Sequence, residues 1–449
     1  MPTRTVIVLG GGIAGLASAL RLIQRGLKPI VLEKRPFLGG RAYSFKDRET
    51  GIEIDNGQHV FVGACKQFQK YIADLGVDDQ VTLDDRVGFP VVKRGKVTWL
   101  RGRKLPSALS NLSMLIGYKH LGITNKFRIL WGLLRIKRTN LDIRHDQLSF
   151  YDWLKGHHQN EETIENFWNL IILPSLNDDI NSVNAYTGIS LFKVAFLGPN
   201  KNAAIGVPLI GLSSLVGESA RDLIENAGGA IKTGFSAAGI HMESGQVIGV
   251  RSQDGELVKG NAVISALPAA DMISLLNRSP GMHHDFFKPA ESVQTAPIVA
   301  IHIWYNRPVL TEKYTAVLNS PLQWVFNDTL LKSRDDDGGQ HIIISLSGAW
   351  KWQDRSKGEL KEIFTAEMAR TFPKAKTATI TRFTVVKMLE ATFRVSVGSL
   401  ASRLPQQTPV PGFYLAGDWT DTGWPSTMES AVRSGNLAAD YVAQDITKP

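Results

Sequence analysis

Apolar and polar residues change their spacing twice near the start of the chain. An unbroken apolar run from Thr5 to Leu9 predicts a buried strand, and a glycine-rich stretch follows it. Apolar residues then recur at helical spacing from Ile13 to Arg25, and a second strand-like run occupies Pro29 to Glu33. This order of strand, turn, helix and strand predicts a parallel βαβ unit.

The rest of the chain contains two more pieces of the same kind and two blocks of a different kind. Residues 227–268 predict short strands separated by Gly and Asp turns, and residues 412–446 predict a strand, a polar glycine loop and a helix. Residues from 86 to about 204 mainly favour helices. Residues from about 291 to 400 contain the strand-like runs PIVAIHIWY, HIIISLSGAW and TATITRFTVVKM, with the helical run GELKEIFTAEMARTF between the last two.

Because these two blocks interrupt the nucleotide-type pieces, we expect an α/β fold with two interleaved domains. The first is a discontinuous, Rossmann-like nucleotide-binding domain, and the second is an α+β substrate domain. We assign residues 1–85, 205–290 and 401–449 to the first domain, and residues 86–204 and 291–400 to the second.

Composition narrows the class of protein. The chain has 449 residues, of which 43% are apolar, so it is long enough for two or three globular cores. Its single cysteine, Cys65, excludes an intramolecular disulfide, favours the reducing cytoplasm, and is expected to be a small buried hydrophobic residue. His157 and His158 have no metal-ligand spacing with other residues, so no metal site is expected.

The glycine-rich stretch has the spacing of a dinucleotide-binding loop. Gly10, Gly12 and Gly15 form the pattern G-x-G-x-x-G between the first strand and the helix. The first glycine permits a tight turn, the second lets a pyrophosphate approach the backbone, and the third lets helix and strand pack closely. Glu33 ends the second strand, where an acid can bind both hydroxyls of an adenosine ribose. The loop alone does not distinguish FAD from NAD.

Four further motifs carry a resemblance to a known superfamily. Gly39-Gly40-Arg41 follows the ribose acid, IDNGQHVF occupies residues 54–61, NAVISALP occupies residues 261–268, and YLAGDWTDTGWPSTMESAVRSG occupies residues 414–435. Together they resemble the monoamine oxidase and phytoene desaturase superfamily over nearly the whole chain. The resemblance implies a Rossmann-like domain of the amine oxidase type that holds FAD. We expect the FAD to be bound tightly and non-covalently, because the final loop contains no cysteine or histidine for a covalent attachment. The cofactor-binding positions that it implies are Gly10, Gly12, Ile13, Ala14, Gly15, Glu33, Lys34, Gly40, Arg41, Gly57, Gln58, His59, Ala237, Gly417, Asp418, Thr427 and Met428.

Two of the motifs resemble one branch of this superfamily more closely. DNGQHVFVGAC and AGDWTDTGWPSTMESAVRSG are similar to the squalene-associated FAD-dependent desaturases, the hydroxysqualene dehydroxylases of squalene and hopanoid synthesis. The resemblance implies that reduced FAD replaces the hydroxyl group of hydroxysqualene with hydrogen. The chain departs from the family pattern at Trp424, where a smaller residue is common, and at TMES, where TIEG is more usual.

This reaction requires an acid, because an allylic hydroxyl leaves with difficulty as hydroxide. His59, Asp421 and Glu429 lie close to the cofactor motifs, and we expect the acid to be Asp421 or His59. Each of these three residues can have a structural role instead of a catalytic one. His59 can bond a flavin carbonyl or the backbone, Asp421 can cap the turn before the last helix, and Glu429 can lie on the solvent face of that helix.

Other functions fit the same superfamily. A carotenoid desaturase runs the hydride chemistry in the oxidative direction on a similar polyprenoid, and an amine oxidase is a more distant alternative. A non-enzymatic carrier of prenyl chains could dispense with the intact cofactor motifs. We expect a polyprenoid lipid substrate, with other enzymes of squalene synthesis as partners.

Basic residues are concentrated in one segment. Thirteen Lys or Arg and no Asp or Glu lie between Arg86 and Leu141, although the whole chain has a net charge of only +9. Within residues 101–140, two sets of apolar residues recur at helical spacing, and lysine and arginine flank both sets. We expect these helices to lie on an anionic membrane surface without crossing it, which places a cytoplasmic, peripheral protein on the inner face of the membrane. An ordinary helical cap on the second domain is the alternative, and nucleic-acid binding is not expected. The two sets are Leu105, Leu109, Leu112 and Ile116, and Phe127, Leu130 and Leu134.

Overall fold

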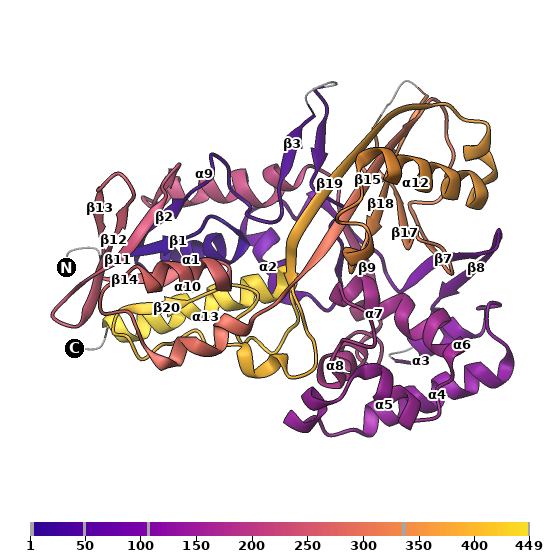
Figure 1. The fold of residues 1–449 in the computed structure, drawn as a ribbon, viewed down its shortest axis with the longest axis horizontal. Coiled ribbons are helices and arrows are strands. Elements are labelled where there is room, and N and C mark those ends of the chain that lie inside the picture. The colour runs from indigo at the N-terminus through magenta and orange to yellow at the C-terminus, as the bar shows by residue number, and fades with distance from the viewer. Residues whose placement is uncertain (1–3, 48–50, 106–107, 335–337, 448–449) are drawn as a thin grey trace.

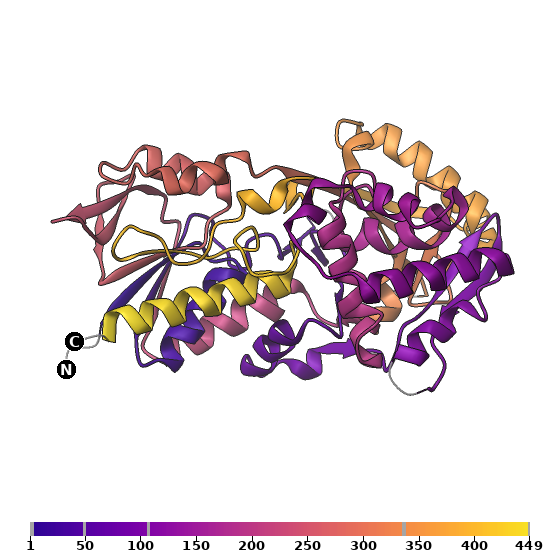
Figure 2. The same cartoon turned by 90° about the horizontal axis from the view of Figure 1, so that it is seen from below.

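The computed structural model describes residues 4–47, 51–105, 108–334 and 338–447, which form two halves (Figure 1). The half that contains both chain ends is built on a five-stranded sheet. The other half contains a seven-stranded sheet with a cluster of helices below it, and Figure 2 shows the two halves side by side from that underside.

The predicted βαβ unit is confirmed. β1 (Thr5–Leu9), α1 (Ile13–Gln24) and β2 (Lys28–Glu33) follow one another, and the two strands pair in parallel. Three later strands complete the sheet in the order β10, β2, β1, β14, β20, and every pairing is parallel. The carboxyl ends of all five strands therefore lie at one edge, where ligands of open parallel sheets bind. The later strands are β10 (Ala230–Thr233), β14 (Ala262–Ser265) and β20 (Phe413–Leu415).

Alternate residues of β1 enter two different cores. Val6 and Val8 pack with apolar residues of α1, α9 (Ser219–Asn226) and α13 (Met428–Thr447). Ile7 and Leu9 face the opposite side, toward a small antiparallel sheet and α10 (Ala269–Asn277). The parallel sheet is thus covered on both faces, as parallel sheets generally are. The other elements of this half are β3 (Ser44–Lys46), β4 (Glu53–Asp55), β5 (Phe61–Val62), α2 (Lys66–Asp74), β6 (Val81–Leu83), β9 (Ile205–Pro208), β11 (Ala237–Glu243), β12 (Gln246–Ser252) and β13 (Leu257–Lys259).

The three strand-like runs predicted between residues 291 and 400 lie next to one another in the second sheet. They form β15 (Thr295–Tyr305), β18 (Gln340–Leu346) and β19 (Ile380–Phe393), and the predicted helix is α12 (Lys357–Thr371). The sheet order is β19, β15, β18, β17, β16, β7, β8. The elements that complete this region are β16 (Tyr314–Val317), β17 (Trp324–Asn327) and α11 (Asp328–Leu331).

The two faces of β15 differ in character. Val299, Ile301 and Ile303 pack against α12 in an apolar core. Ala300, His302 and Trp304 alternate with them and therefore point to the other side of the sheet. That side faces away from α12, toward the rest of the molecule.

Residues 86–204 are mainly helical, as predicted, but the block begins with a hairpin that the sequence analysis did not include. β7 (Gly88–Lys93) and β8 (Lys96–Arg101) pair in antiparallel fashion and extend the second sheet. Arg94 and Gly95 have φ values of 49° and 74°, as a two-residue hairpin turn of this type requires. The helices that follow are α3 (Ala108–Leu112), α4 (Ile123–Arg138), α5 (Phe150–Gly156), α6 (Glu161–Thr163), α7 (Asn169–Leu176) and α8 (Ala185–Ala195).

The first of the two predicted amphipathic helices, which was expected to include Leu105 and Ile116, is shorter than predicted. Leu105 lies outside any helix, α3 has only five residues, and a 3₁₀ turn over Ser113–Leu115 follows it, while residues 106 and 107 fall outside the described residues. The second predicted helix is confirmed as α4, which has 16 residues. Within the described ranges, no helix combines the length and the apolarity needed to cross a membrane.

The first and last helices of the chain, α1 and α13, pack so closely at Gly435 that no side chain fits there. A Cβ atom at Gly435 of α13 would overlap the Ala14 carbonyl oxygen of α1. We predict that Gly435→Val lowers the free energy of unfolding by about 1–3 kcal/mol, because it overpacks this contact. Thermal unfolding followed by circular dichroism measures the change. Gly156→Ala is the control, since nothing lies within 4 Å of a Cβ at that helical position, and an equal loss in both variants would contradict the prediction.

Candidate functional site

The glycine loop forms a sharp turn at the carboxyl edge of the parallel sheet. Gly10 has a φ of +101°, and its N–H donates to the Leu32 carbonyl at 2.8 Å. A Cβ atom at Gly15 would overlap the Gly10 carbonyl oxygen, so glycine is needed where α1 begins this close to β1. Gly12, Ile13 and Ala14 consequently lie at the N-terminus of α1, where backbone N–H groups and the helix dipole favour phosphate.

Glu33 lies against this turn. Its buried carboxylate accepts hydrogen bonds from the Gly11 N–H at 2.6 Å and from the Arg35 N–H at 2.8 Å. The Phe235 N–H donates to the Glu33 carbonyl oxygen at 2.9 Å. Ala237, the first residue of β11, lies two residues after Phe235. The side chain of Lys34 points outward and pairs with Asp271 at 3.0 Å.

The second glycine pair packs directly on the first loop. Gly39 donates its N–H to the Gly11 carbonyl at 2.8 Å, and a Cβ atom at Gly40 would lie 2.9 Å from the Gly12 Cα. The backbone after β2 therefore runs along the backbone of the glycine loop with no side chain between them. This close approach leaves Arg41 beside the loop.

Arg41 binds a residue from the end of the chain. Its guanidinium forms an ion pair with the buried Asp418 carboxylate and donates to the Ala391 carbonyl at 3.1 Å. The Ser426 hydroxyl also donates to Asp418. Residues far apart in the sequence thus meet at the same edge of the sheet.

The C-terminal motif folds over the start of α13. The Gly417 N–H donates to the Ser434 hydroxyl at 2.8 Å, and the Ser430 hydroxyl donates to the Asp418 carbonyl at 3.0 Å. Thr427 accepts a hydrogen bond from the Ser430 N–H at 3.2 Å, and Met428 is the first residue of the helix. A helix N-terminus therefore points into this motif, as the sequence predicts.

The segment from Asp55 to His59 connects the two halves of the molecule. Asp55 is buried, and its carboxylate accepts from the Ser44 hydroxyl at 2.7 Å and the Leu212 N–H at 3.0 Å. Lys332, from the second half, pairs with the same carboxylate at 2.7 Å. Gly57 lies under β15, because a Cβ atom placed on it would be 3.5 Å from the Ala300 Cβ.

The two polar residues after Gly57 differ in their partners. Gln58 Oε1 is buried and has no hydrogen-bond partner within the described ranges of the chain. His59 is half-buried, and its Nδ1 lies 3.1 Å from the Gly57 carbonyl oxygen. Burial lowers the pKa of the His59 imidazole below its ordinary value, while the contact with Gly57 and the charge of Asp55 oppose this shift.

These residues fit a bound FAD. Gly12 and Gly40 form a backbone cradle that a side chain would fill, and the Arg41 guanidinium, paired with Asp418, belongs to the residue that follows this cradle. The unpartnered Gln58 oxygen provides a buried hydrogen-bond acceptor on the motif IDNGQHVF, where the resemblance implies cofactor-binding residues. When bound, FAD supplies hydride transfer, and the residues of this chain hold and orient it.

The other candidate acids have partners that give them structural roles. Asp421 is exposed, and its carboxylate accepts from the Gly423 N–H at 3.3 Å within the turn before α13. Glu429 is fully buried, contrary to the solvent-facing alternative, and accepts from the Phe68 N–H at 2.8 Å while pairing with Arg433 at 2.7 Å. Cys65 is buried, as predicted, and burial raises the pKa of its thiol to about 12.

The sequence analysis missed two groups of residues in the second sheet. One is a set of aromatic rings, in which Trp324 lies 4.9 Å from Phe89 and 6.1 Å from Phe326 between ring centroids. The other is a buried polar chain that includes His302 and His341. A histidine within the apolar run PIVAIHIWY was the available signal for this chain. In the described part of the molecule, no three His, Cys, Asp or Glu side chains converge on a metal position.

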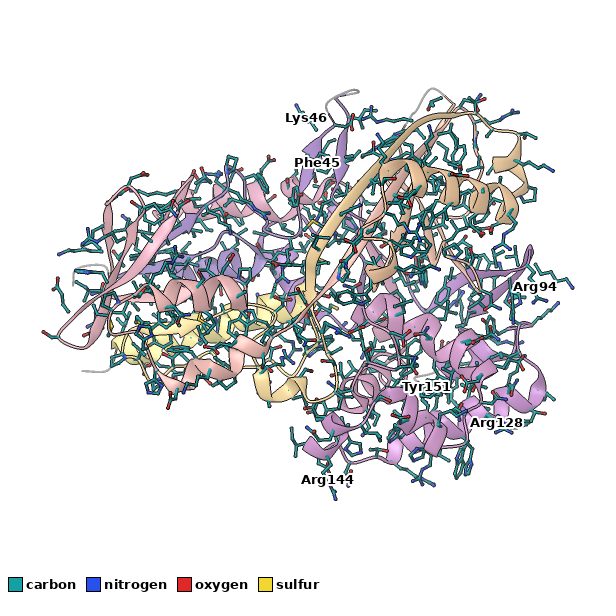
Figure 3. The ribbon with its side chains drawn as sticks, viewed as in Figure 1. Phe45, Lys46, Arg94, Arg128, Arg144 and Tyr151 are labelled. Atoms are coloured by element: carbon teal, nitrogen blue, oxygen red, sulfur yellow. The ribbon has the colours of Figure 1, made fainter. Side chains whose placement is uncertain are left out.

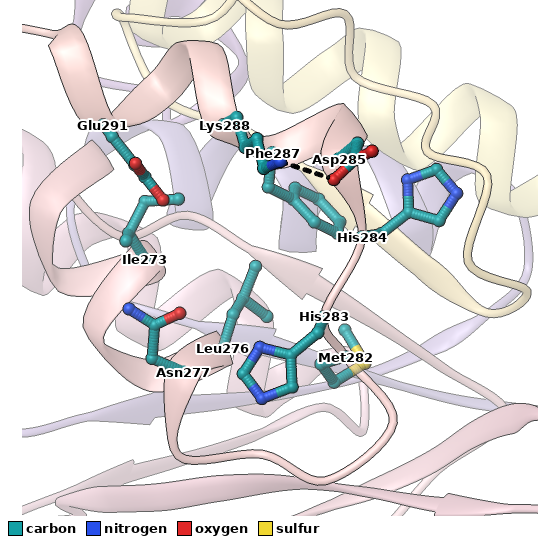
Figure 4. A pocket seen from close by; sticks show the side chains of 10 residues that line it. All are labelled: Ile273, Leu276, Asn277, Met282, His283, His284, Asp285, Phe287, Lys288 and Glu291. Carbon is teal, nitrogen blue, oxygen red and sulfur yellow. Dashed lines mark ion pairs between the residues drawn. The ribbon is translucent and has the colours of Figure 1, made fainter.

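A separate surface pocket of about 450 Å³ lies between α10 and the 3₁₀ segment Asp285–Ser292 (Figure 4). Lys288 and Asp285 form an ion pair of 2.8 Å at its rim, and His283 and Leu276 also line it. None of the predicted cofactor residues lines this pocket.

Known proteins resemble this chain over its full length. A 15-cis-phytoene desaturase of Capsicum annuum is 26% identical over 98% of this chain and 78% of its own. A hydroxysqualene dehydroxylase of Rhodopseudomonas palustris is 27% identical over 98% of both chains. Among solved structures, a variant of putrescine oxidase superposes with a TM-score of 0.76 at 17% identity, covering 98% of this chain and 99% of its own.

The family model for flavin-containing amine oxidoreductases matches residues 13–443, which is nearly the whole chain. The matched residues include all of α1, which follows the glycine loop, and nearly all of α13, the C-terminal helix. The chain therefore belongs to the flavin-containing amine oxidoreductase family, and its cofactor is FAD.

Proposed function

We propose that the protein is a hydroxysqualene dehydroxylase, which uses reduced FAD to replace the hydroxyl of hydroxysqualene with hydrogen. The observation that carries this proposal is the match to the dehydroxylase of Rhodopseudomonas palustris, because it spans 98% of both chains. The residues of the IDNGQHVF motif and of the C-terminal motif resemble the same hydroxysqualene dehydroxylase branch.

The chemistry of the second sheet supports an uncharged polyprenoid substrate. The face of β15 that lies over Gly57 continues into aromatic side chains from β7 and β17. Aromatic rings bind apolar chains and attract a cation to their faces, so they can stabilise a carbocation that forms when the hydroxyl leaves. Phytoene desaturase is the second candidate function, because several of the relatives are named 15-cis-phytoene desaturases.

The exposed side of α4 supports attachment to a membrane. Ile123 and Phe127 are 68% and 65% exposed, and Leu130 and Trp131 continue the same stripe, while Ile129 and Leu133 face the protein core. Lys126 donates to the Ile116 carbonyl at 3.4 Å, so the exposed Ile116 lies close to this stripe. Arg94, Arg128 and Arg144 lie at the periphery of the same half (Figure 3). We assign this surface to an anionic lipid bilayer, from which a cytoplasmic, peripheral enzyme would draw its substrate.

The reaction can be tested with the two candidate substrates. We predict that the anaerobically reduced enzyme converts hydroxysqualene to squalene, and that the oxidised enzyme does not desaturate phytoene. Product analysis by gas chromatography with mass spectrometry measures both. Desaturation of phytoene without dehydroxylation would assign the protein to the carotenoid branch instead.

Arg41 provides a test of the cofactor site. We predict that Arg41→Ala raises the dissociation constant of FAD by about tenfold, because it removes a charge-assisted contact to the pyrophosphate. Titration of the flavin-free protein, followed by flavin fluorescence, measures this constant. Arg25→Ala is the control, since Arg25 pairs with Asp440 on the outer side of the same domain. Equal FAD affinity in both variants would remove Arg41 from the site.

The proposed membrane-binding surface of the protein is tested by reversing the charge of its basic residues. We predict that changing Arg135, Lys137 and Arg138 to Glu lowers binding to anionic vesicles by about a hundredfold, since each well-placed basic residue contributes about 1 kcal/mol. Vesicle sedimentation measures binding, and FAD content should stay unchanged. The same reversal at the exposed Lys361, Lys374 and Lys376 is the matched control. Undiminished binding of the first variant would exclude α4 as the attachment surface.

A further inference from the structure

Three buried side chains of the second sheet form a continuous hydrogen-bonded chain. Asp328, at the start of α11, lies 2.9 Å from His341 Nδ1, and His341 Nε2 lies 3.1 Å from His302 Nδ1. Asp328, His341 and His302 are each at most 1% exposed. Water therefore has no direct access to this chain, and its protons are held by the protein.

Two cations balance the negative charge at the inner end of the chain. Lys332 lies 3.0 Å and Arg334 lies 2.9 Å from the Asp328 carboxylate, and Lys332 also pairs with Asp55. Burial opposes ionisation of Asp328, but the hydrogen bond from His341 and the charges of His341, Lys332 and Arg334 hold its pKa below the ordinary carboxyl range. Asp328 is therefore anionic, and it orients the His341 ring with a proton on Nδ1.

The outer end of the chain is unsatisfied. His302 Nε2 is buried and has no hydrogen-bond partner among the residues that the structure describes. Burial lowers the pKa of His302 well below its ordinary value, and the charges of His341, Lys332 and Arg334 lower it further, against the opposing charge of Asp328. A buried polar nitrogen without a partner destabilises the folded protein, so His302 Nε2 is free to bind a polar group of a ligand.

The unsatisfied nitrogen lies on the face of the sheet that covers residues 55–59, the segment that we name the flavin-side segment because the resemblance implies that it binds the cofactor. Ala300 and His302 point to the same side of β15, and Ala300 is the residue that lies over Gly57. His302 also shares a cross-strand row with Ile343 and with Phe326 of the aromatic set. A ligand that reaches His302 Nε2 would consequently lie close to both the flavin-side segment and the aromatic rings.

The plane of the central ring is fixed by stacking. Trp304 lies parallel to His341, with 4.1 Å between the ring centroids and 3° between the ring planes, and the Arg382 guanidinium lies 5.4 Å from the Trp304 centroid. Because His341 cannot rotate without losing this contact, its two nitrogens stay aligned with Asp328 and His302. The arrangement has the form of a proton relay.

We propose that His302, supported by His341 and Asp328, binds the hydroxyl of the substrate and supplies the proton with which that hydroxyl leaves. This proposal rests on the proposed dehydroxylase function. His302 is the catalytic residue, because its Nε2 would touch the substrate oxygen, whereas His341 and Asp328 are positioning residues. The acids predicted from the sequence for this role are Asp421 and His59, of which Asp421 is exposed.

The step balances in protons and electrons. His302 Nε2 gives its proton to the hydroxyl oxygen while His302 Nδ1 takes a proton from His341 Nε2 along the hydrogen bond that joins them. The carbon–oxygen bond breaks and its electron pair leaves with water. The carbon then accepts the hydride, with two electrons, that the reduced flavin supplies, so the alcohol is reduced and the flavin is oxidised.

Two substitutions at His302 test the roles of its two ring nitrogens separately. An Asn side chain places its polar end near the Nδ1 position, so His302→Asn keeps the contact with His341 and removes the outer nitrogen. A Gln side chain reaches the Nε2 position, so His302→Gln keeps a hydrogen-bonding group for the substrate that cannot transfer a proton. His145→Asn is the matched control, because His145 pairs with Asp142 at 3.2 Å in the 3₁₀ segment between α4 and α5.

Binding to the oxidised, FAD-loaded enzyme is measured first, because no turnover occurs there. We expect the wild type to bind hydroxysqualene about tenfold more tightly than squalene, His302→Gln to keep this preference within about threefold, and His302→Asn to lose it. Turnover of hydroxysqualene by the reduced enzyme is measured second. We expect kcat to fall about a hundredfold in both variants and to stay unchanged in His145→Asn.

The outcomes distinguish this proposal from the function on which it rests. If the wild type reduces hydroxysqualene and His302→Asn retains both the preference and the turnover, the relay is overturned and the proposed function stands. Loss of turnover in Asp421→Asn or His59→Gln, with both His302 variants active, would place the acid at that residue instead. If the wild type neither prefers nor reduces the alcohol, the proposed function fails and the relay fails with it.

Discussion

The cofactor-binding half depends on backbone segments that approach one another more closely than side chains allow. Gly15 lets α1 begin against the end of β1, and Gly40 brings the chain after β2 onto the Gly12 backbone. Gly435 lets the last helix pack on the first. These contacts join the start and the end of the sequence at one edge of the parallel sheet, where Arg41 meets Asp418. A phosphate-binding cradle of this kind is made of N–H groups and a few charges, so its shape is set by the absence of side chains.

Charged side chains then link this half to the sheet that covers it. Asp55 pairs with Lys332, Asp47 pairs with Arg382, and Arg334 donates to the Glu53 carbonyl at 3.2 Å. The hairpin of β3 and β4 is thereby held against the second sheet at several points. Because Gly57 lies two residues after this hairpin, the ion pairs also hold the Asp55–His59 segment close to β15. The reaction space is therefore bounded by two elements from different halves.

The features that the sequence predicted are those whose signals are local. The βαβ unit, the three long strands β15, β18 and β19, and the helix α12 each show an unbroken periodic pattern. The hairpin of β7 and β8 was missed because a two-residue turn at Arg94 and Gly95 interrupts a short, basic stretch. The predicted helix after Leu105 was too long, since its polar residues and turns allow only α3 and a 3₁₀ turn.

The cofactor motifs were accessible for the same local reason, whereas the polar chain of the second sheet was not. Asp328, His341 and His302 come from three elements, and only the strand register places them in line. The sequence offered one indication, a histidine inside an apolar strand, but gave no partner for it. Contacts of this type depend on tertiary packing, so reasoning from the sequence favoured the acids that lie beside the recognisable motifs.

The direction of hydride transfer decides which reaction the protein catalyses, and a single turnover measures it directly. The FAD-loaded enzyme is reduced without oxygen, mixed with a slight excess of hydroxysqualene, and followed by the return of flavin absorbance while the product is quantified. We expect one molecule of squalene for each flavin that becomes oxidised, with deuterium in the product when the flavin carries deuterium at its transferable position. A flavin that stays reduced with hydroxysqualene, together with bleaching of the oxidised enzyme by phytoene, would contradict hydride transfer from the flavin to the alcohol.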